Sequence, residues 1–198
     1  LKPTGTYCQW AQAYELDERT MRMMFATVHS VFPDATVWRT TAADYLFIAR
    51  MDNALVDYAR LVSKFKANPA LTEDLEPLRH ASPGGILACY VMGPKDLAKI
   101  AKTGEINTDD MPLLEFWAPR GLYHGSSTAN FDWIQEYTSS RLPEMTNFHP
   151  TQSQLMRLYL DMAAAKIQKS TGSIEGLIVE ARDLCQEVLD IDRHNAEA

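Results

Sequence analysis

The chain of 198 residues has little of what usually reveals a chemistry. Its three cysteines, Cys8, Cys89 and Cys185, lie far apart and form no CxxC pair. We therefore expect buried, reduced thiols in a cytosolic protein, without disulfides. The five histidines are scattered, and none stands four residues from another histidine or from a cysteine. This spacing predicts no metal site.

Long apolar runs and cofactor loops are missing as well. The longest apolar stretches are as short as Ile86–Met92, far below the length that spans a bilayer. The only adjacent glycines, Gly84 and Gly85, lack the spacing of a phosphate-binding loop, and no serine stands in a nucleophile elbow. We expect no membrane contact by this segment, no catalytic residue and no bound cofactor.

The chain has fewer positively than negatively charged residues, and this balance limits the partners that it can bind. The chain has 19 Lys and Arg against 26 Asp and Glu, a net charge of -7. An acidic surface repels phosphates, so we expect no nucleic-acid partner. With 46% hydrophobic and 23% charged residues, the composition is that of an ordinary globular protein of one to one and a half domains.

The first fifty residues predict a strand, a helix and a hairpin. Thr6–Tyr14 has the composition of a strand, and Asp17 is a predicted N-cap. The helix that follows carries apolar residues at helical spacing, namely Met21, Met24, Phe25 and Val28. Two β-rich runs, 35–40 and 45–50, flank a short polar turn and predict a hairpin. This order is typical of the closing part of an open α/β sheet whose last strand is antiparallel.

The remainder is predicted to be mainly helical. Helices are expected at about 55–65, 82–92 and 94–103, and the alternation in 113–116 predicts a short strand. The polar stretch 142–150, with proline near both ends, is the expected linker. The tail predicts an αα-hairpin that buries one apolar face of each helix, made of Leu155, Leu158, Met162 and Ile167 on the first and Ile174, Leu177, Ile178, Ala181, Leu184, Val188 and Leu189 on the second.

Two runs contain candidate binding residues. In Tyr7–Leu16, Gln9 and Gln12 stand among aromatics near the carboxyl end of the expected strand, where ligands of open α/β sheets lie. A glutamine there can bind an amine or hydroxyl, or it can merely satisfy the backbone at the strand end. In the second run, Asn107–Pro119, the side chains of Asn107, Asp109 and Asp110 are expected to organise a turn rather than to bind a cation.

These runs together resemble a known family. The order GTYCQWAQAYEL, VFPDATVWRT and DYLFIAR, followed by NTDDMPLLEFWAPR, is similar to the C-terminal half of the catalytic domain of spermidine synthases, above all to bacterial spermidine synthase-like proteins. The resemblance covers about residues 1–123. It implies the C-terminal part of a Rossmann-like, methyltransferase-type sheet.

The resemblance also implies a reaction. The family transfers an aminopropyl group from decarboxylated S-adenosylmethionine to an amine. Gln9 corresponds to a substrate-binding glutamine, the one site residue that carries over. The family's glycine-rich cofactor loop and its Asp-rich catalytic loop precede the matching region and do not occur in this sequence. The opening LKPTG is typical of a turn before an inner strand, so we expect a C-terminal piece of a longer bacterial, cytoplasmic protein that is inactive alone.

The predicted organisation leaves a second function open. Residues 1–128 form the expected α/β region with a helical insertion, and 151–198 form a helical hairpin that resembles the end of a tetratricopeptide repeat. The alternative function is a helical protein-interaction module, about 54–198, attached to a non-catalytic α/β remnant. The expected partners are the missing N-terminal half of the domain and, because a strand edge would be left open, a second copy of the chain.

Overall fold

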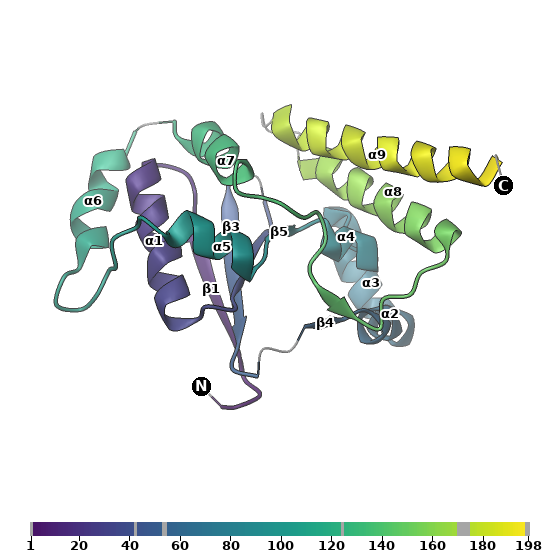
Figure 1. The fold of residues 1–198 in the computed structure, drawn as a ribbon, viewed down its shortest axis with the longest axis horizontal. Coiled ribbons are helices and arrows are strands. Elements are labelled where there is room, and N and C mark those ends of the chain that lie inside the picture. The colour runs from purple at the N-terminus through teal and green to yellow at the C-terminus, as the bar shows by residue number, and fades with distance from the viewer. Residues whose placement is uncertain (1, 42, 53–54, 124, 170–174, 197–198) are drawn as a thin grey trace. The chain divides into compact units, whose positions relative to one another are not determined.

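The computed structural model describes residues 2–41, 43–52, 55–123, 125–169 and 175–196. The chain is mixed α/β with a mainly helical C-terminal region, and it forms two compact units (Figure 1). Each unit is built from two separated segments: unit 1 from Leu1–Ala54 and Tyr90–Pro143, unit 2 from Leu55–Cys89 and Glu144–Ala198. The two units are described separately below.

Unit 1 is organised around a four-stranded sheet. Its strands are β1 (Thr6–Gln12), β2 (Thr36–Arg39), β3 (Asp44–Arg50) and β5 (Tyr90–Met92), in the order β1-β3-β2-β5 with antiparallel neighbours. Since β1 and β2 are both antiparallel to β3, they run in the same direction, and helix α1 (Glu18–Val31) connects them. The predicted strand, helix and hairpin are confirmed.

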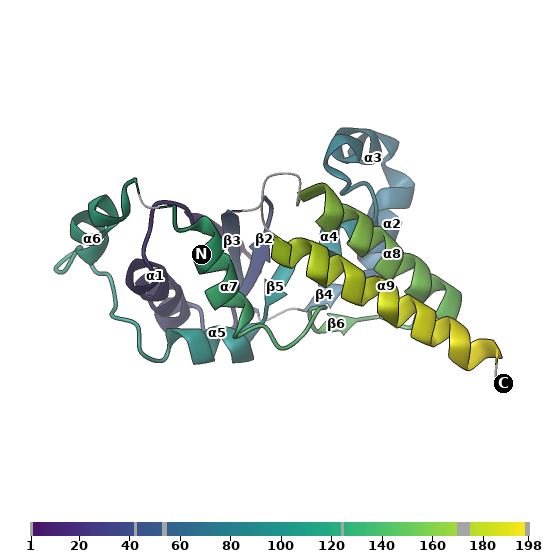
Figure 2. The ribbon, with the colours of Figure 1, turned by 90° about the horizontal axis from the view of Figure 1, so that it is seen from above.

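One face of this sheet carries the core of unit 1. Helices α1, α5 (Pro94–Ala101) and α7 (Ser127–Gln135) lie on the same side of the sheet (Figure 2). Asp17 caps α1 as predicted, since its carboxylate accepts the Thr20 N–H at 2.8 Å. Phe25 of α1 is fully buried and meets Phe47 of β3 and Trp133 of α7 edge-on. Burying such aromatic side chains is the main source of stability here.

The opposite face of the sheet is less well covered. Side chains alternate between the faces of a strand, and the even-numbered residues of β1 and β3 lie opposite the buried Ala11, Tyr45 and Phe47. On that face Leu46 is only half-buried, and Trp10 is 49% exposed. In the part of the chain that the structure describes, no helix of unit 1 lies over this face (Figure 2).

Two elements of unit 1 differ from the sequence prediction. The helix expected at 82–92 ends at Leu87 as α4 (Pro83–Leu87), and Tyr90–Met92 form strand β5, which pairs with the edge of β2. The strand expected at 113–116 is instead the start of helix α6 (Leu113–Gly121). For β5 a tertiary partner, β2, outweighs the local pattern. At the start of α6 the side chain of Asn107 accepts the Leu114 N–H, a local contact that the alternation of apolar residues did not indicate.

Unit 2 is mainly helical. It contains β4 (Val56–Asp57) and β6 (Met145–Thr146), which pair in parallel, and five α-helices and one 3₁₀ helix among its described residues. These are α2 (Tyr58–Ala67), α3 (Pro69–Leu75), the 3₁₀ helix η1 (Glu76–Leu78), α4, α8 (Gln152–Lys169) and α9 (Glu175–Ala196). Strand β6 lies within the expected linker, so part of that stretch belongs to the fold of unit 2.

The predicted tail hairpin is confirmed, but its buried face is narrower than expected. Helices α8 and α9 pack along each other and bury Leu158, Met162, Leu177, Ala181, Leu184 and Val188. Ile167, Ile178 and Leu189 were expected inside and are 52%, 54% and 51% exposed. Helix α8 packs on α9 and also on α4, and the faces of α8 and α9 that carry Ile167, Ile178 and Leu189 are left exposed. Ile174 lies outside the described residues.

A buried carboxylate joins α5 to the segment after α7, and it predicts acid sensitivity. Asp96 is 3% exposed and accepts hydrogen bonds from Lys99 Nζ and from the backbone N–H and hydroxyl of Ser139. Burial acts to raise the pKa of Asp96, but the hydrogen bonds from Lys99 and Ser139 outweigh it and lower the pKa below its usual value. A carboxylate with a lowered folded-state pKa stabilises the fold above the unfolded pKa of about 4 and loses this effect as the pH falls through the folded value.

We expect Asp96→Asn to lower the free energy of unfolding at pH 7 by roughly 1.5–3 kcal/mol, because a hydrogen-bonded charge is lost. The difference from the unsubstituted protein should shrink below about pH 4. Urea denaturation at pH 7 and at pH 3 measures both values. A difference that stays constant between these two pH values would contradict the account of Asp96.

Candidate functional site

The predicted substrate-binding residue, Gln9, lies at the middle of β1, an edge strand of the sheet. Its side chain is exposed, and both ends of its amide are engaged within β1. Gln9 Oε1 accepts the Tyr7 hydroxyl at 2.8 Å, and Gln9 Nε2 donates to the Trp10 carbonyl at 2.8 Å. The structure therefore places Gln9 where a ligand can reach it, while its amide already has local partners.

The free edge of β1 can be assigned from one backbone bond. Ala13 N–H donates to the Ala43 carbonyl at 2.8 Å, and this pair continues the register of β1 with β3. Hydrogen-bonded pairs alternate along an antiparallel ladder, so Tyr7, Gln9 and Ala11 direct their backbone groups toward β3. Thr6, Cys8, Trp10 and Gln12 direct theirs outward. The Trp10 carbonyl that Gln9 engages thus belongs to the outer edge.

An aromatic ring and a carboxylate meet on the face of β1 opposite to Gln9. Trp10 Nε1 donates to Asp44 Oδ1 at 3.0 Å, and Thr41 Oγ1 donates to the other oxygen of the same carboxylate at 2.5 Å. An exposed indole next to a carboxylate suits an organic cation, because ring and carboxylate both attract positive charge. We name Tyr7, Gln9, Trp10 and Asp44 the β1 surface, in which Tyr7 and Gln9 lie on one face of the strand and Trp10 and Asp44 on the other. The sequence prediction missed Asp44, since only the pairing of β1 with β3 brings it to Trp10.

The turn after β1 is held rigidly from two helices. Asn130 of α7 is buried, and its Nδ2 donates to the carbonyls of Ala13 and Leu16, both at 2.8 Å. The Leu16 N–H donates to Ser126 Oγ at 3.2 Å. Glu15 adopts a left-handed conformation with φ 54°, and Gly121 packs directly against its carbonyl. The carboxyl end of β1, the usual ligand position in such sheets, is therefore occupied by the protein's own groups.

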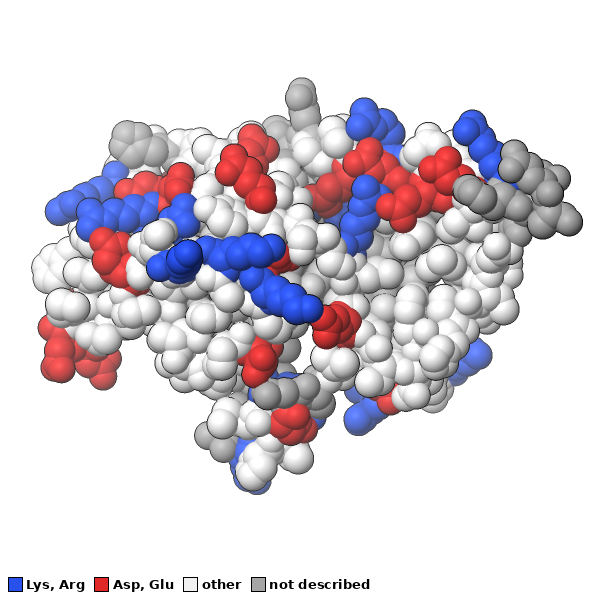
Figure 3. All heavy atoms as spheres, viewed as in Figure 1, with Lys and Arg blue, Asp and Glu red and all other residues white. Residues whose placement is uncertain are grey.

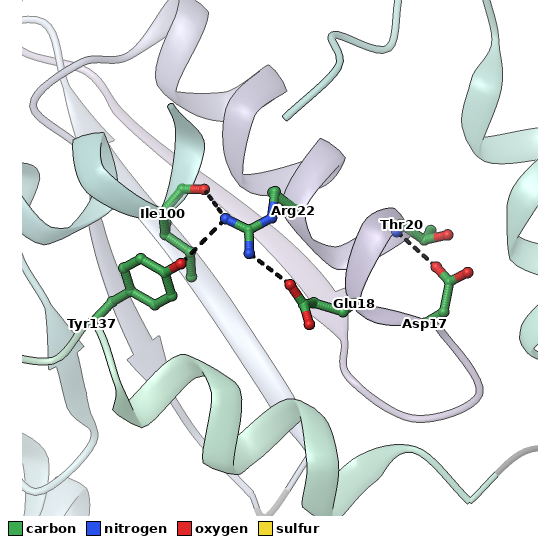
Figure 4. Close-up of polar contacts among 6 residues, drawn as sticks. All are labelled: Asp17, Glu18, Thr20, Arg22, Ile100 and Tyr137. Carbon is green, nitrogen blue, oxygen red and sulfur yellow. Dashed lines mark hydrogen bonds and ion pairs between the residues drawn. The ribbon is translucent and has the colours of Figure 1, made fainter. Parts of the chain in front are cut away.

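A second polar cluster is centred on Arg22 of α1, and Figure 4 shows its contacts. The guanidinium donates to the Ile100 carbonyl and to Tyr137, and it forms an ion pair with Glu18 at 2.6 Å. It also lies 4.8 Å from the ring centroid of Trp133. Burial acts to lower the pKa of Arg22, but its bonds to Glu18 and Tyr137 outweigh it and raise the pKa. Arg22 connects α1 to α5 and to α7 and its following turn, a structural role.

The polar run 107–110 forms a turn, as predicted, but not through its two aspartates. Asn107 Oδ1 accepts the Leu114 N–H at 2.9 Å, and Thr108 Oγ1 accepts the Met111 N–H at 3.0 Å. Both contacts arrange the entry to α6. Asp109 and Asp110 are exposed. Within residues 2–196, outside the gaps stated above, no three His, Cys, Asp or Glu side chains are placed to hold one metal ion.

Neither the charge distribution on the surface nor the comparison with known proteins identifies a further candidate site. Positive and negative side chains are interspersed on the face that Figure 3 shows. None of the described helices combines the length and apolarity needed to cross a bilayer. Comparison with family models, with curated proteins and with solved structures finds no match for this chain.

Proposed function

We propose that this chain is the C-terminal segment of a spermidine synthase-like protein, a family that transfers an aminopropyl group from decarboxylated S-adenosylmethionine to an amine. In this proposal unit 1 supplies the end of a Rossmann-like sheet and one wall of the amine site. The cofactor loop and the Asp-rich loop belong to the preceding part of the protein. The chain alone then has no transferase activity, because transfer needs both reactants held in line.

The observation that carries the proposal is the order of strands in unit 1. Strands β1 and β2 run in the same direction and are joined by α1, while β3 returns antiparallel between them. A parallel pair with a helical crossover is the unit from which open α/β sheets are built. The antiparallel last strand agrees with the ending that the motifs GTYCQW, VFPDATVWRT and DYLFIAR imply. The outer edge of β1 is then the place where the preceding strand joins.

The β1 surface has the chemistry that a polyamine requires. An ammonium group can donate a hydrogen bond to Gln9 Oε1. The ammonium group would then take the place of the Tyr7 hydroxyl, which donates to this oxygen in the structure. The indole of Trp10 and the carboxylate of Asp44 provide a second cation-binding point on the other face of β1.

We expect spermidine to shift the backbone NMR signals of Tyr7, Gln9 and Trp10 and the indole signal of Trp10, with saturation at millimolar concentration. Gln9→Ala should weaken binding about 2–10-fold, the value of one hydrogen bond. Gln152→Ala is the control, since Gln152 is an exposed glutamine at the start of α8, outside the sheet. Magnesium at equal ionic strength controls for charge alone. Shifts spread over the acidic surface, unaltered by Gln9→Ala, would contradict the assignment of Gln9.

A second function is favoured by one feature of unit 2. The outer faces of α8 and α9 expose Leu160, Ile167, Ile178, Val179 and Leu189 by 44–54% each. Exposed apolar side chains on a helical hairpin are typical of protein-binding surfaces. The helical part would then act as an interaction module, and pull-down of a partner that Ile178→Glu abolishes would support it.

A further inference from the structure

A buried thiol and a buried imidazole meet in unit 2. Cys89 is 7% exposed and His80 is 8% exposed, and the distance between Cys89 Sγ and His80 Nε2 is 3.5 Å. The thiol also lies 3.8 Å from the Gly85 carbonyl. In the tautomer with its proton on Nδ1, the imidazole is the closer and the more basic acceptor of the thiol proton. A thiol beside an imidazole is the arrangement that activates cysteine nucleophiles.

The backbone fixes this pair in place. Arg79 is left-handed with φ 56°, and the His80 N–H donates to the Leu75 carbonyl at 3.1 Å. Helix α4 packs directly on this turn at Gly85, where an added Cβ would lie 2.5 Å from the Arg79 carbonyl oxygen and 2.7 Å from His80 Cα. Close approach of these two backbones holds the imidazole against the thiol, so the geometry is preorganised.

Cys8 and Cys185 differ from Cys89 in their surroundings. Cys8 is exposed on β1, and Cys185 is half-buried on α9. Neither has an imidazole among the described hydrogen-bond contacts of the chain. They therefore serve as internal references for an unassisted thiol in the same protein.

We infer that Cys89 and His80 form a thiol–disulfide exchange site for small, uncharged disulfides. His80 Nε2 takes the thiol proton, and the Cys89 thiolate attacks one sulfur of the disulfide R–S–S–R. The bond between the two sulfurs breaks, a mixed disulfide forms on Cys89, and the leaving thiolate takes the proton from His80 to become R–SH. The disulfide is the oxidant and Cys89 is oxidised, so electrons and atoms balance. A small, uncharged reagent is required because Cys89 is buried and the chain is acidic.

The test is the rate of mixed-disulfide formation with 2-hydroxyethyl disulfide at pH 7, followed by intact mass. The variant Cys8→Ser/Cys185→Ser leaves Cys89 as the sole thiol, and Cys89→Ser/Cys185→Ser leaves exposed Cys8. We expect Cys89 to react about tenfold faster than Cys8, because His80 Nε2 lies within reach of the Cys89 thiol and can take its proton during the attack. The rate at Cys89 should not change at low urea concentrations, which excludes reaction through unfolding.

The role of His80 is tested in the Cys89-only protein. His80→Ala should slow the reaction about tenfold, and added imidazole should restore part of the rate by filling the space that is left. His80→Gln serves if His80→Ala does not fold, and the comparison of Cys89 with Cys8 decides the question if neither variant folds. A Cys89 that reacts more slowly than Cys8, or at a rate independent of His80, would overturn the inference and leave a structural thiol.

Discussion

We expect Gly121→Ala to be the most destabilising single-methyl change in unit 1. Gly121 is the buried last residue of α6, and an added Cβ would lie 2.2 Å from the Glu15 carbonyl oxygen and 2.9 Å from Leu16 Cα. Both contacts are with backbone, in a turn that Asn130 and Ser126 also hold, so neither side can yield cheaply. The free energy of unfolding should fall by about 3 kcal/mol, the upper end for an overpacked site.

Thermal unfolding followed by circular dichroism measures this effect as a fall in Tm of roughly 6–12 °C. Gly125→Ala is the matched control, because a Cβ at Gly125 meets no atom within 4 Å. That variant should be neutral or slightly more stable, since alanine restricts the unfolded chain. Equal Tm values for the two variants would show that α6 does not pack on the turn after β1.

The second large effect concerns the open edge of β1. Thr6, Cys8, Trp10 and Gln12 direct their backbone groups away from β3, and β1 contains no charged residue and no proline to block pairing. Such an edge pairs readily with another strand. We expect the chain to form a homodimer of about twice its 22.3 kDa mass at micromolar concentration, with two β1 strands antiparallel across a two-fold axis. In the proposed longer protein the preceding strand would occupy this edge instead.

Light scattering after size-exclusion chromatography gives the mass directly. Cys8→Lys places a charge on the exposed face of β1 and should shift the protein to the monomer, since edge charges oppose pairing. Ser30→Lys adds the same charge at an exposed position of α1 and should leave the dimer intact. A monomer for the unsubstituted chain at all concentrations, or equal effects of the two lysines, would contradict the role of the β1 edge.

Local sequence signals predicted the elements whose stabilising contacts are close in sequence. Asp17 bonds to an amide three residues away, so its capping role could be inferred without the fold. The pairing of β2 with β3 and the packing of α8 on α9 also join elements that follow each other in the sequence. The periodicity of α1 predicted Met21 and Phe25 as core residues, and both are fully buried.

Features that depend on contacts between residues far apart in the sequence could not be predicted from local patterns. Strand β5 exists because β2 offers it an edge about fifty residues earlier, while its own sequence continues an apolar helical run. Asn130 holds a turn 114–117 residues away, and nothing near it in the sequence marks that role. The resemblance implies Gln9 as a binding residue, but only the register of β1 with β3 reveals that the Trp10 carbonyl, to which Gln9 donates, lies on the outer edge.

The sequence of the reading frame upstream of the Leu1 codon tests the central proposal most directly. If unit 1 is the end of an aminopropyltransferase sheet, the frame continues upstream and encodes a glycine-rich loop after a strand, followed by an Asp-rich loop, before the strand that joins β1. A start codon immediately before Leu1 would contradict the proposal and favour the interaction module.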